Sequence, residues 1–253
     1  MLKDFSFKSY QLLLNKLIDN GYGFQTFRDF LINPQNKTIL LRHDIDLKKR
    51  SSLKIASLEK KMNICSTFYF RAVSQIFDEK IIKSIAEMGH EIGYHYENLA
   101  LAKGNYETAM VLFKKHLEMF RKITRINTIC MHGNSLSKFD NRKLWEKYSY
   151  RDFGIIGEPY FDLDFNKVLY LTDTAQRWNG SDISVRDHVK SNFNYSFRTT
   201  FDIINNINKL PDTIMLTVHP DRWTDNPLEW YRIHYTVKIK NFIKKNILKK
   251  RHN

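Results

Sequence analysis

Short apolar segments alternate with longer amphipathic segments along most of this chain, and this alternation restricts the fold more than any other feature. Short apolar runs bounded by turn residues are typical of buried strands, and apolar residues with a 3.6-residue period are typical of helices. The strands are predicted at 38–46, 66–70, 91–97, 126–131, 154–156, 168–171 and 213–218, with helical segments between most of them. Repeated βα units imply a parallel sheet. We expect one α/β, barrel-like domain over residues 1–253, because no Pro-, Gly- or Ser-rich linker divides the chain.

Helical segments are predicted at both ends of this domain. Residues 5–31 carry an apolar stripe (Tyr10, Leu13, Leu14, Leu17, Ile18), and residues 228–250 form a long basic helix with lysines between its apolar residues. The favoured interpretation of the second helix is an apolar face packed on the barrel and lysines in water. The alternative is contact with an anionic membrane surface, since basic amphipathic helices bind anionic lipids.

Composition limits the class of protein. The hydrophobic content of 42% in 253 residues is enough for a sizeable core, and both cysteines, Cys65 and Cys130, are expected to be free thiols. No apolar run is long enough to span a bilayer, and the start of the chain lacks a secretory signal, which predicts a cytoplasmic protein. The net charge of +14 suggests an anionic partner, but a solvated basic surface is the favoured interpretation because the lysines are spread along the chain.

Ionisable side chains follow the apolar residues of four predicted strands. They are Asp44 and Asp46, then His95 and Glu97, then His132, and then His219. The carboxyl ends of parallel strands in a βα barrel meet at one rim, where active sites are built. Any one of these residues alone is more simply explained as a hydrogen-bonded structural group. Their coincidence at one rim predicts a functional site.

Carboxylate and imidazole ligands suit zinc or another divalent first-row metal. Such an ion lowers the pKa of a bound water and polarises a carbonyl. A second carboxylate can take the proton of the water, and a histidine can protonate the leaving group. The residues at the rim therefore predict metal-dependent hydrolysis.

Three stretches of the sequence resemble the motifs of the polysaccharide deacetylase superfamily, the NodB-homology domain of carbohydrate esterase family 4. They are Arg42-His43-Asp44-Ile45-Asp46, Gly89-His90-Glu91-Ile92-Gly93-Tyr94-His95 and Leu216-Thr217-Val218-His219-Pro220. The resemblance covers residues 38–223 and implies a distorted, seven-stranded βα barrel that removes acetyl groups from glycans with a divalent metal. His132-Gly133-Asn134 and His219-Pro220-Asp221-Arg222-Trp223 resemble most closely the deacetylase-like proteins encoded among genes for bacterial capsule and O-antigen synthesis. The resemblance thus implies a sugar, nucleotide-sugar or lipid-linked glycan as partner.

The resemblance also implies roles for individual residues. Asp44 matches the catalytic base of the family, Asp46 and His95 match metal ligands, and His219 matches the catalytic acid. Asp173 and Trp178 loosely match an Asp/Trp motif that orients the acid or lines the pocket. The residues expected to bind substrate are Glu97, Asn134, Arg177, Trp178 and Trp223.

The sequence departs from the family pattern at two points. Leu99 stands where the family has its second ligand histidine, so we expect His132 as the third ligand, before Glu97 and then His90. The Arg-x-Pro-Pro motif of the family is absent, so the arginine that pairs with the base is open among Arg42, Arg71 and Arg177.

Two other functions remain as alternatives. A non-catalytic glycan-binding relative is favoured by the missing ligand at Leu99, and the retained Asp44, Asp46, His95 and His219 argue against it. A nucleic-acid-binding protein is favoured only by the charge, since no nucleic-acid motif is present and the basic residues do not cluster with aromatic ones except near the C-terminus. We therefore expect no nucleic-acid partner.

Overall fold

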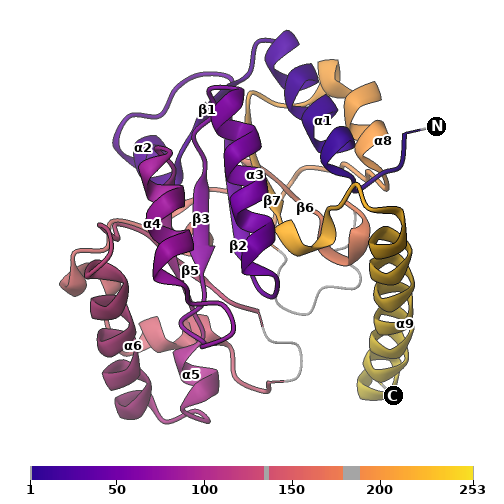
Figure 1. Ribbon diagram of the computed structural model, residues 1–253. Coiled ribbons are helices and arrows are strands. Elements are labelled where there is room, and N and C mark those ends of the chain that lie inside the picture. The colour runs from indigo at the N-terminus through magenta and orange to yellow at the C-terminus, as the bar shows by residue number, and fades with distance from the viewer. Residues whose placement is uncertain (1, 134–136, 179–188, 253) are drawn as a thin grey trace.

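The computed structural model describes residues 2–133, 137–178 and 189–252, with side chains up to residue 241 (Figure 1). The strands are β1 Gly23–Gln25, β2 Thr38–Ile45, β3 Thr67–Phe70, β4 Glu91–Tyr96, β5 Ile129–Met131, β6 Leu169–Thr172 and β7 Thr213–Val218. The α-helices are α1 Phe7–Asp19, α2 Phe27–Ile32, α3 Lys49–Lys61, α4 Glu79–Glu87, α5 Asn98–Leu101, α6 Tyr106–Arg121, α7 Pro159–Asp162, α8 Thr200–Asn205 and α9 Pro227–His252. Short 3-10 helices include Asn141–Glu146, Tyr150–Phe153 and Pro220–Arg222.

All seven strands lie parallel in one sheet with the order β5-β4-β3-β2-β7-β6. β2 is the central strand. It pairs with β7 along one edge, and on the other edge it pairs first with β1 (Gln25 opposite Leu40) and then with β3 (Arg42 opposite Thr67). Among the described residues no ladder joins β5 to β6, so the ring stays open there. The prediction of an α/β fold with a distorted, seven-stranded βα barrel is confirmed.

The two sides of β2 carry different residues because side chains in a strand alternate. Ile39, Leu41 and Ile45 belong to the main core with apolar residues of α1 and α3. Leu40 lies on the opposite side in a second, smaller core that includes Phe27 of α2. This second core closes the interior at the amino ends of the strands. Functional groups are therefore confined to the carboxyl ends.

Most predicted elements are present, and the differences have physical reasons. The stripe of α1 is buried at Tyr10, Leu13, Leu14 and Leu17, whereas Ile18 is exposed. β1 was not predicted, because three residues are too few to show an alternation and only pairing with β2 defines the strand. Residues 154–156 form no strand; the nearby Gly157 makes only an isolated bridge to Thr128.

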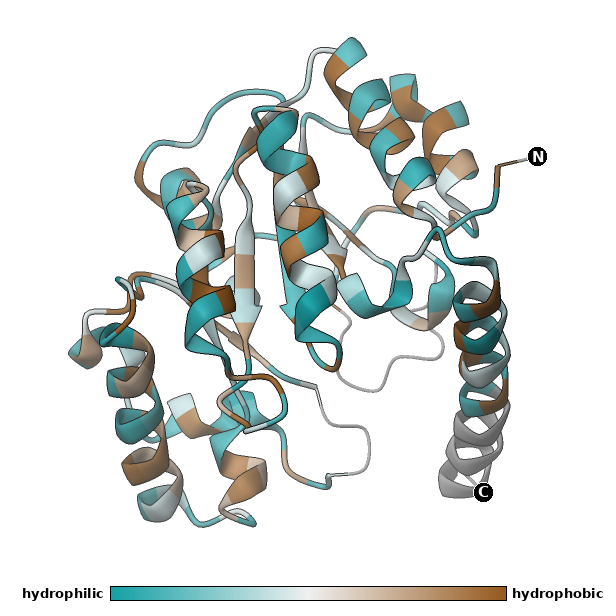
Figure 2. Cartoon of the chain, viewed as in Figure 1, coloured by the Kyte–Doolittle hydropathy of each residue, from teal (hydrophilic) through white to brown (hydrophobic). Residues whose placement is uncertain are grey.

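The described side chains of the C-terminal helix α9, which end at residue 241, do not form one packed apolar face. Ile233 and Val237 face a cavity of the domain, whereas Leu228, Tyr231, Tyr235 and Ile239 are exposed. Figure 1 shows α9 at the margin of the molecule, and Figure 2 shows hydrophilic and hydrophobic residues interspersed along its described part. Up to residue 241 the apolar residues of α9 are thus divided between the cavity and the exposed surface, which differs from the single packed face that was expected. None of the helices in the described chain combines the length and the apolar character that crossing a membrane requires.

Gly93 supplies the first testable prediction, because a tyrosine ring occupies the place of its missing side chain. Tyr69 is the register partner of Gly93 on β3, and a Cβ on Gly93 would lie 2.2 Å from its ring and 3.0 Å from the Thr128 carbonyl oxygen. We expect Gly93→Ala to lower the free energy of unfolding by about 1–3 kcal/mol, as overpacking of a core does. Urea denaturation measures this loss.

Gly23→Ala is the matched control in the same experiment. Gly23 also lies in a strand, but a Cβ there has no neighbour within 4 Å. We expect this variant to be as stable as the wild type, because the added methyl group meets no atom. Equal stability of both variants would contradict the close approach at Gly93.

Candidate metal centre and acid–base site

The carboxyl ends of four strands bring together the ionisable residues singled out in the sequence. Asp44 lies near the end of β2 and Asp46 just beyond it, and His95 lies in β4. His132 follows β5, where its backbone N–H donates to the Tyr96 carbonyl and so extends the pairing with β4. His219 follows β7, and Asp173 lies beside it because the Asp173 N–H donates to the Thr217 carbonyl.

The side chains of Asp46, His95 and His132 form a compact triangle of ligand atoms. Asp46 Oδ1 lies 3.1 Å from His132 Nδ1 and 3.5 Å from His95 Nε2, and the two imidazole nitrogens are 3.3 Å apart. Ligand atoms at about 2.05 Å from a tetrahedral zinc ion are separated by about 3.3 Å. The triangle therefore has the size of three corners of such a site.

The protonation and hydrogen bonding of these residues also fit a cation. Asp46 Oδ1 is buried and accepts no hydrogen bond from the residues that the structure describes. Burial raises the pKa of the Asp46 carboxyl, but the imidazoles of His132, His95 and His219 outweigh it and hold that pKa well below the usual range. His95 Nδ1 lies 3.0 Å from the Cys130 carbonyl, to which it donates as an N–H; this leaves Nε2 free to face the cluster, as in most metal-bound histidines. These residues fit a divalent ion such as zinc.

Asp44 is held by Arg42, two residues earlier on the same side of β2. Arg42 Nε and Nη2 donate to Asp44 Oδ1 and Oδ2 over 2.8 and 2.6 Å, and both side chains are buried. Tyr69 and Tyr160 place their rings 5.8 and 5.4 Å from the guanidinium. Arg42 is therefore the arginine that pairs with the expected base. The structure places Arg71 on Glu97 instead.

His219 is held by Asp173. The His219 ring donates from Nδ1 to Asp173 Oδ1 over 2.6 Å, which leaves Nε2 3.7 Å from Asp46 Oδ2. Asp173 is completely buried, and Arg222 and the Trp223 indole also donate to it. Burial and Arg222 lower the pKa of His219. Asp173 and Asp46 raise it by more, so that the pKa is about 9. The loose match of Asp173 to an orienting motif thus corresponds to a direct contact.

The other ligand candidates lie elsewhere. Glu97 accepts two hydrogen bonds from Arg71, at 2.7 and 2.9 Å, and its Oε2 is 4.0 Å from His132 Nε2. His90 lies on the outer side of the sheet, where its ring contacts the Ala56 carbonyl and Ser66. Leu99 is buried in α5 as part of the main core.

The expected substrate residues are placed less favourably. The indoles of Trp178 and Trp223 are only 3% and 1% exposed, and they donate to Thr200 and Asp173. Both residues were expected to bind substrate, but they are buried in the core and are not among the described residues that line the cavity. Arg177 is partly buried and is not among the described residues that line the cavity. Asn134 lies outside the described residues.

Cys130 is a site residue that the sequence analysis did not recognise. Its thiol groups with Asp44 and His95 in a second set of possible ligand atoms, deeper in the barrel than the first. Cys130 is a buried thiol, whereas the thiol of Cys65 is exposed. Its position two residues before His132 puts both on the same side of the strand, and this alternation was the available signal.

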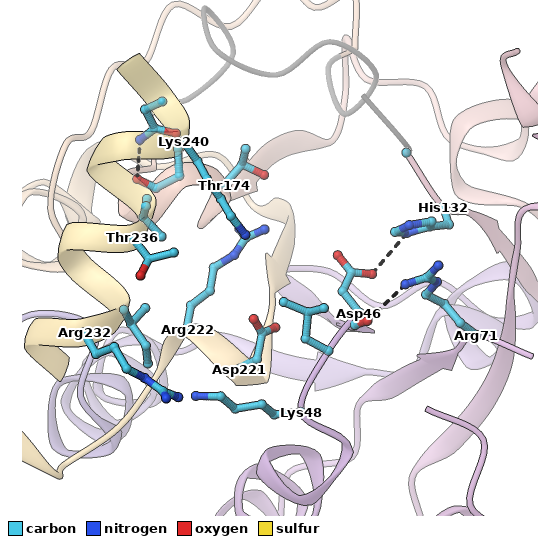
Figure 3. Close-up of a pocket in the computed structure, with 16 residues that line it drawn as sticks. Asp46, Lys48, Arg71, His132, Thr174, Asp221, Arg222, Arg232, Thr236 and Lys240 are labelled. Carbon is cyan, nitrogen blue, oxygen red and sulfur yellow. Dashed lines mark hydrogen bonds and ion pairs between the residues drawn. The ribbon is translucent and has the colours of Figure 1, made fainter. Parts of the chain in front are cut away.

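A cavity of about 690 Å³ opens on the metal centre. Asp46, Arg71 and His132 line one side, and α9 lines the opposite side (Figure 3). The volume is that of a pocket for a small ligand, which is about 300–1,000 Å³. Helix α9 is therefore part of the site, a role that its sequence did not reveal.

This fold and site define a class of protein: an α/β barrel with a candidate divalent-metal centre and two flanking acid–base groups. A scan of the sequence against protein-family models finds no match, and a search of curated proteins finds none. Among solved structures, the chain is similar to a family 4 carbohydrate esterase pseudoenzyme from Bacillus anthracis, with 14% identity and a TM-score of 0.46, over 82% of this chain and 63% of that one. The chain thus spans less than two thirds of that protein.

Two further structures show similarity of the same degree. One is a family 4 carbohydrate esterase from Bacillus anthracis, with 14% identity and a TM-score of 0.43, over 90% of this chain and 84% of that one. The other is a family 4 carbohydrate esterase from Bacillus subtilis, with 17% identity and a TM-score of 0.42, over 90% and 83%. These similarities are distant, so the function is argued from the residues of this chain.

Proposed function

We propose that this protein is a metal-dependent hydrolase that removes an acyl group, N-acetyl in the first instance, from a sugar or glycan. One observation carries the proposal. The ligand triangle of Asp46, His95 and His132 lies between two oriented groups, Asp44 on Arg42 and His219 on Asp173. A site that only binds a glycan needs neither group, and together they match the requirements of acyl hydrolysis. The sequence motifs support the same reaction.

Each residue has a separate role in the proposed reaction. A bound divalent ion, most simply zinc, supplies Lewis-acid polarisation of the acyl carbonyl and acidifies water. Asp44 takes a proton from the attacking water; its Oδ2 is 3.6 Å from His95 Nε2, next to the ligand set. His219 donates a proton from Nε2 to the leaving nitrogen or oxygen. Arg42 and Asp173 orient these two groups and are positioning residues.

Release of acetate from acetylated amino sugars by the zinc-loaded protein tests the proposal. We expect chelation to stop the release and added zinc to restore it. A protein that binds acetylated glycans but releases no acetate, with or without added metal, would favour the alternative of a non-catalytic relative. The missing histidine at Leu99 is the observation that keeps this alternative open.

Asp173→Asn tests the role of His219 through the pH dependence of turnover. A general acid acts only when protonated, so activity falls as the pH rises through its pKa. Asp173 raises the pKa of His219 and Arg222 lowers it. We therefore expect the alkaline limb of the kcat profile to move to lower pH in Asp173→Asn. In Arg222→Gln it should move to higher pH. A shift in the same direction in both variants would contradict this assignment.

We further propose that α9 brings the protein to the inner face of the membrane, where lipid-linked surface glycans are built. Support comes from its exposed Tyr231, Tyr235 and Ile239 and from the absence of acidic residues after Glu229. We expect the protein to float with vesicles that contain anionic lipid and not with neutral vesicles. Equal recovery with both kinds would contradict the proposal.

A further inference from the structure

The wall of the cavity opposite the metal centre is positively charged. Five of the described residues that line the cavity are cationic: Lys48, Arg71, Arg222, Arg232 and Lys240. Only two carboxylates, Asp46 and Asp221, share the lining with them. Since Asp46 belongs to the ligand triangle, the far wall has a clear excess of positive charge.

Three of the five cations have carboxylate partners. Arg71 pairs with Glu97, Arg222 pairs with Asp173, and Lys48 lies 2.6 Å from Glu229. For Arg232 and Lys240 the structure shows no ion pair within the part of the chain it describes. Both lie on α9, eight residues apart, and so on the same side of the helix. The unpaired charge is therefore concentrated on the α9 wall.

The arrangement of these side chains is that of an anion site. Figure 3 shows the charged ends of Arg232 and Lys48 pointing toward one another across the cavity. Glu229 already compensates the charge of Lys48, so the charge that a bound anion would compensate is that of Arg232 and of Lys240. A guanidinium binds two oxygens of a phosphate in a fork, and an ammonium adds a point charge. A phosphate ester carries more negative charge than a carboxylate and has more oxygens that accept hydrogen bonds.

We propose that the α9 wall binds a phosphate or diphosphate ester of the substrate, so that the hydrolase acts on an acylated sugar that carries phosphate. This inference rests on the proposed function, because the metal centre defines the end of the cavity where the acyl group lies. Arg232 and Lys240 hold the phosphate at the other end, and Lys48, which is paired with Glu229, lies beside them. The shared chemistry is a sugar phosphate ester, either of a soluble nucleotide sugar or of a lipid-linked sugar.

Calorimetric binding of two probes tests the inference without any turnover. The probes are N-acetylglucosamine and its 1-phosphate, titrated into the zinc-loaded Asp44→Asn variant so that neither is consumed. We expect the phosphate ester to bind more tightly, and Arg232→Gln or Lys240→Gln to weaken it by about 10-fold each, as loss of a charged hydrogen bond does. Neither substitution should change the binding of the neutral sugar.

Lys238→Gln is the matched control, because it removes the same charge from the same helix. Lys238 is exposed and is not among the described residues that line the cavity. We expect it to bind the phosphate ester as tightly as the parent does. A similar loss in Lys238→Gln, or equal binding of the two probes by the parent, would overturn the inference.

Two further results separate the inference from the function on which it rests. Acetate release from both sugars with the same KM would uphold the hydrolase and overturn the phosphate site. Tight binding of the phosphate ester that depends on Arg232 and Lys240, without acetate release by the wild type, would uphold the site and overturn the hydrolase. Displacement of the sugar phosphate by neutral vesicles that carry a lipid phosphate monoester would identify a lipid-linked ester as the source, and displacement by a nucleoside diphosphate instead would identify a soluble one.

Discussion

Asp44→Asn is expected to lower the rate of acyl hydrolysis by about 100- to 10,000-fold, the contribution of a general base. Asparagine keeps the shape of the side chain and one oxygen for Arg42, but it cannot take a proton. Zinc affinity should stay close to that of the wild type, because Asp44 is outside the triangle of Asp46, His95 and His132. Initial rates of acetate release and zinc calorimetry on the same preparation measure both quantities.

The stability of this variant needs a separate measurement. Arg42 and Asp44 are a buried ion pair, and removal of one buried charge costs about 3–5 kcal/mol when the other stays unpaired. Thermal unfolding of the zinc-loaded variant shows whether it is folded at the assay temperature. A folded, zinc-loaded Asp44→Asn protein with nearly wild-type turnover would assign the base to another residue.

His132→Ala is expected to weaken zinc binding by more than about 100-fold, since even the outer partners of metal ligands contribute 10- to 100-fold. The expected wild-type content is one zinc per chain, and Asp46→Ala and His95→Ala should lose it as well. Competition with a chelator of known affinity measures the change.

Glu97→Gln decides between the two candidates for the third ligand. Glu97 lies on Arg71, and its nearest oxygen is 4.0 Å from His132 Nε2, so we expect this variant to keep its zinc. Loss of zinc in Glu97→Gln together with full affinity in His132→Ala would reverse the assignment. His116→Ala, which changes a histidine of α6 outside the triangle, controls for general effects on folding.

Much of this site follows from alternation within single strands. Arg42 and Asp44 are two residues apart and therefore share a side of β2, and Asp46 follows just beyond the strand with the same spacing. Because the carboxyl ends of parallel strands meet at one rim of a βα barrel, these residues were predicted to lie close together. The helices were predictable for a similar reason, because the apolar residues of a buried helix face recur every three or four positions in the sequence.

The sequence ranked the candidates for contacts between distant segments, as it did for His132, but it did not show how the chain brings these residues together. His132 joins Asp46 and His95 because its N–H extends the pairing of β5 with β4, which depends on register. Among Arg42, Arg71 and Arg177, only the packing of neighbouring strands decides which arginine pairs with Asp44. The indole of Trp223 lies in the core on Asp173 rather than in the cavity for the same reason.

The sequence by itself determined the order of strands and helices, the faces of the strands, and the identity of the groups at the rim. These properties depend on spacing along one segment, and spacing can be counted. The tertiary structure alone decided the partner of the base and the place of α9 as a charged wall of the cavity. Those properties depend on how the sheet curls and where the chain returns, and no local spacing encodes either one.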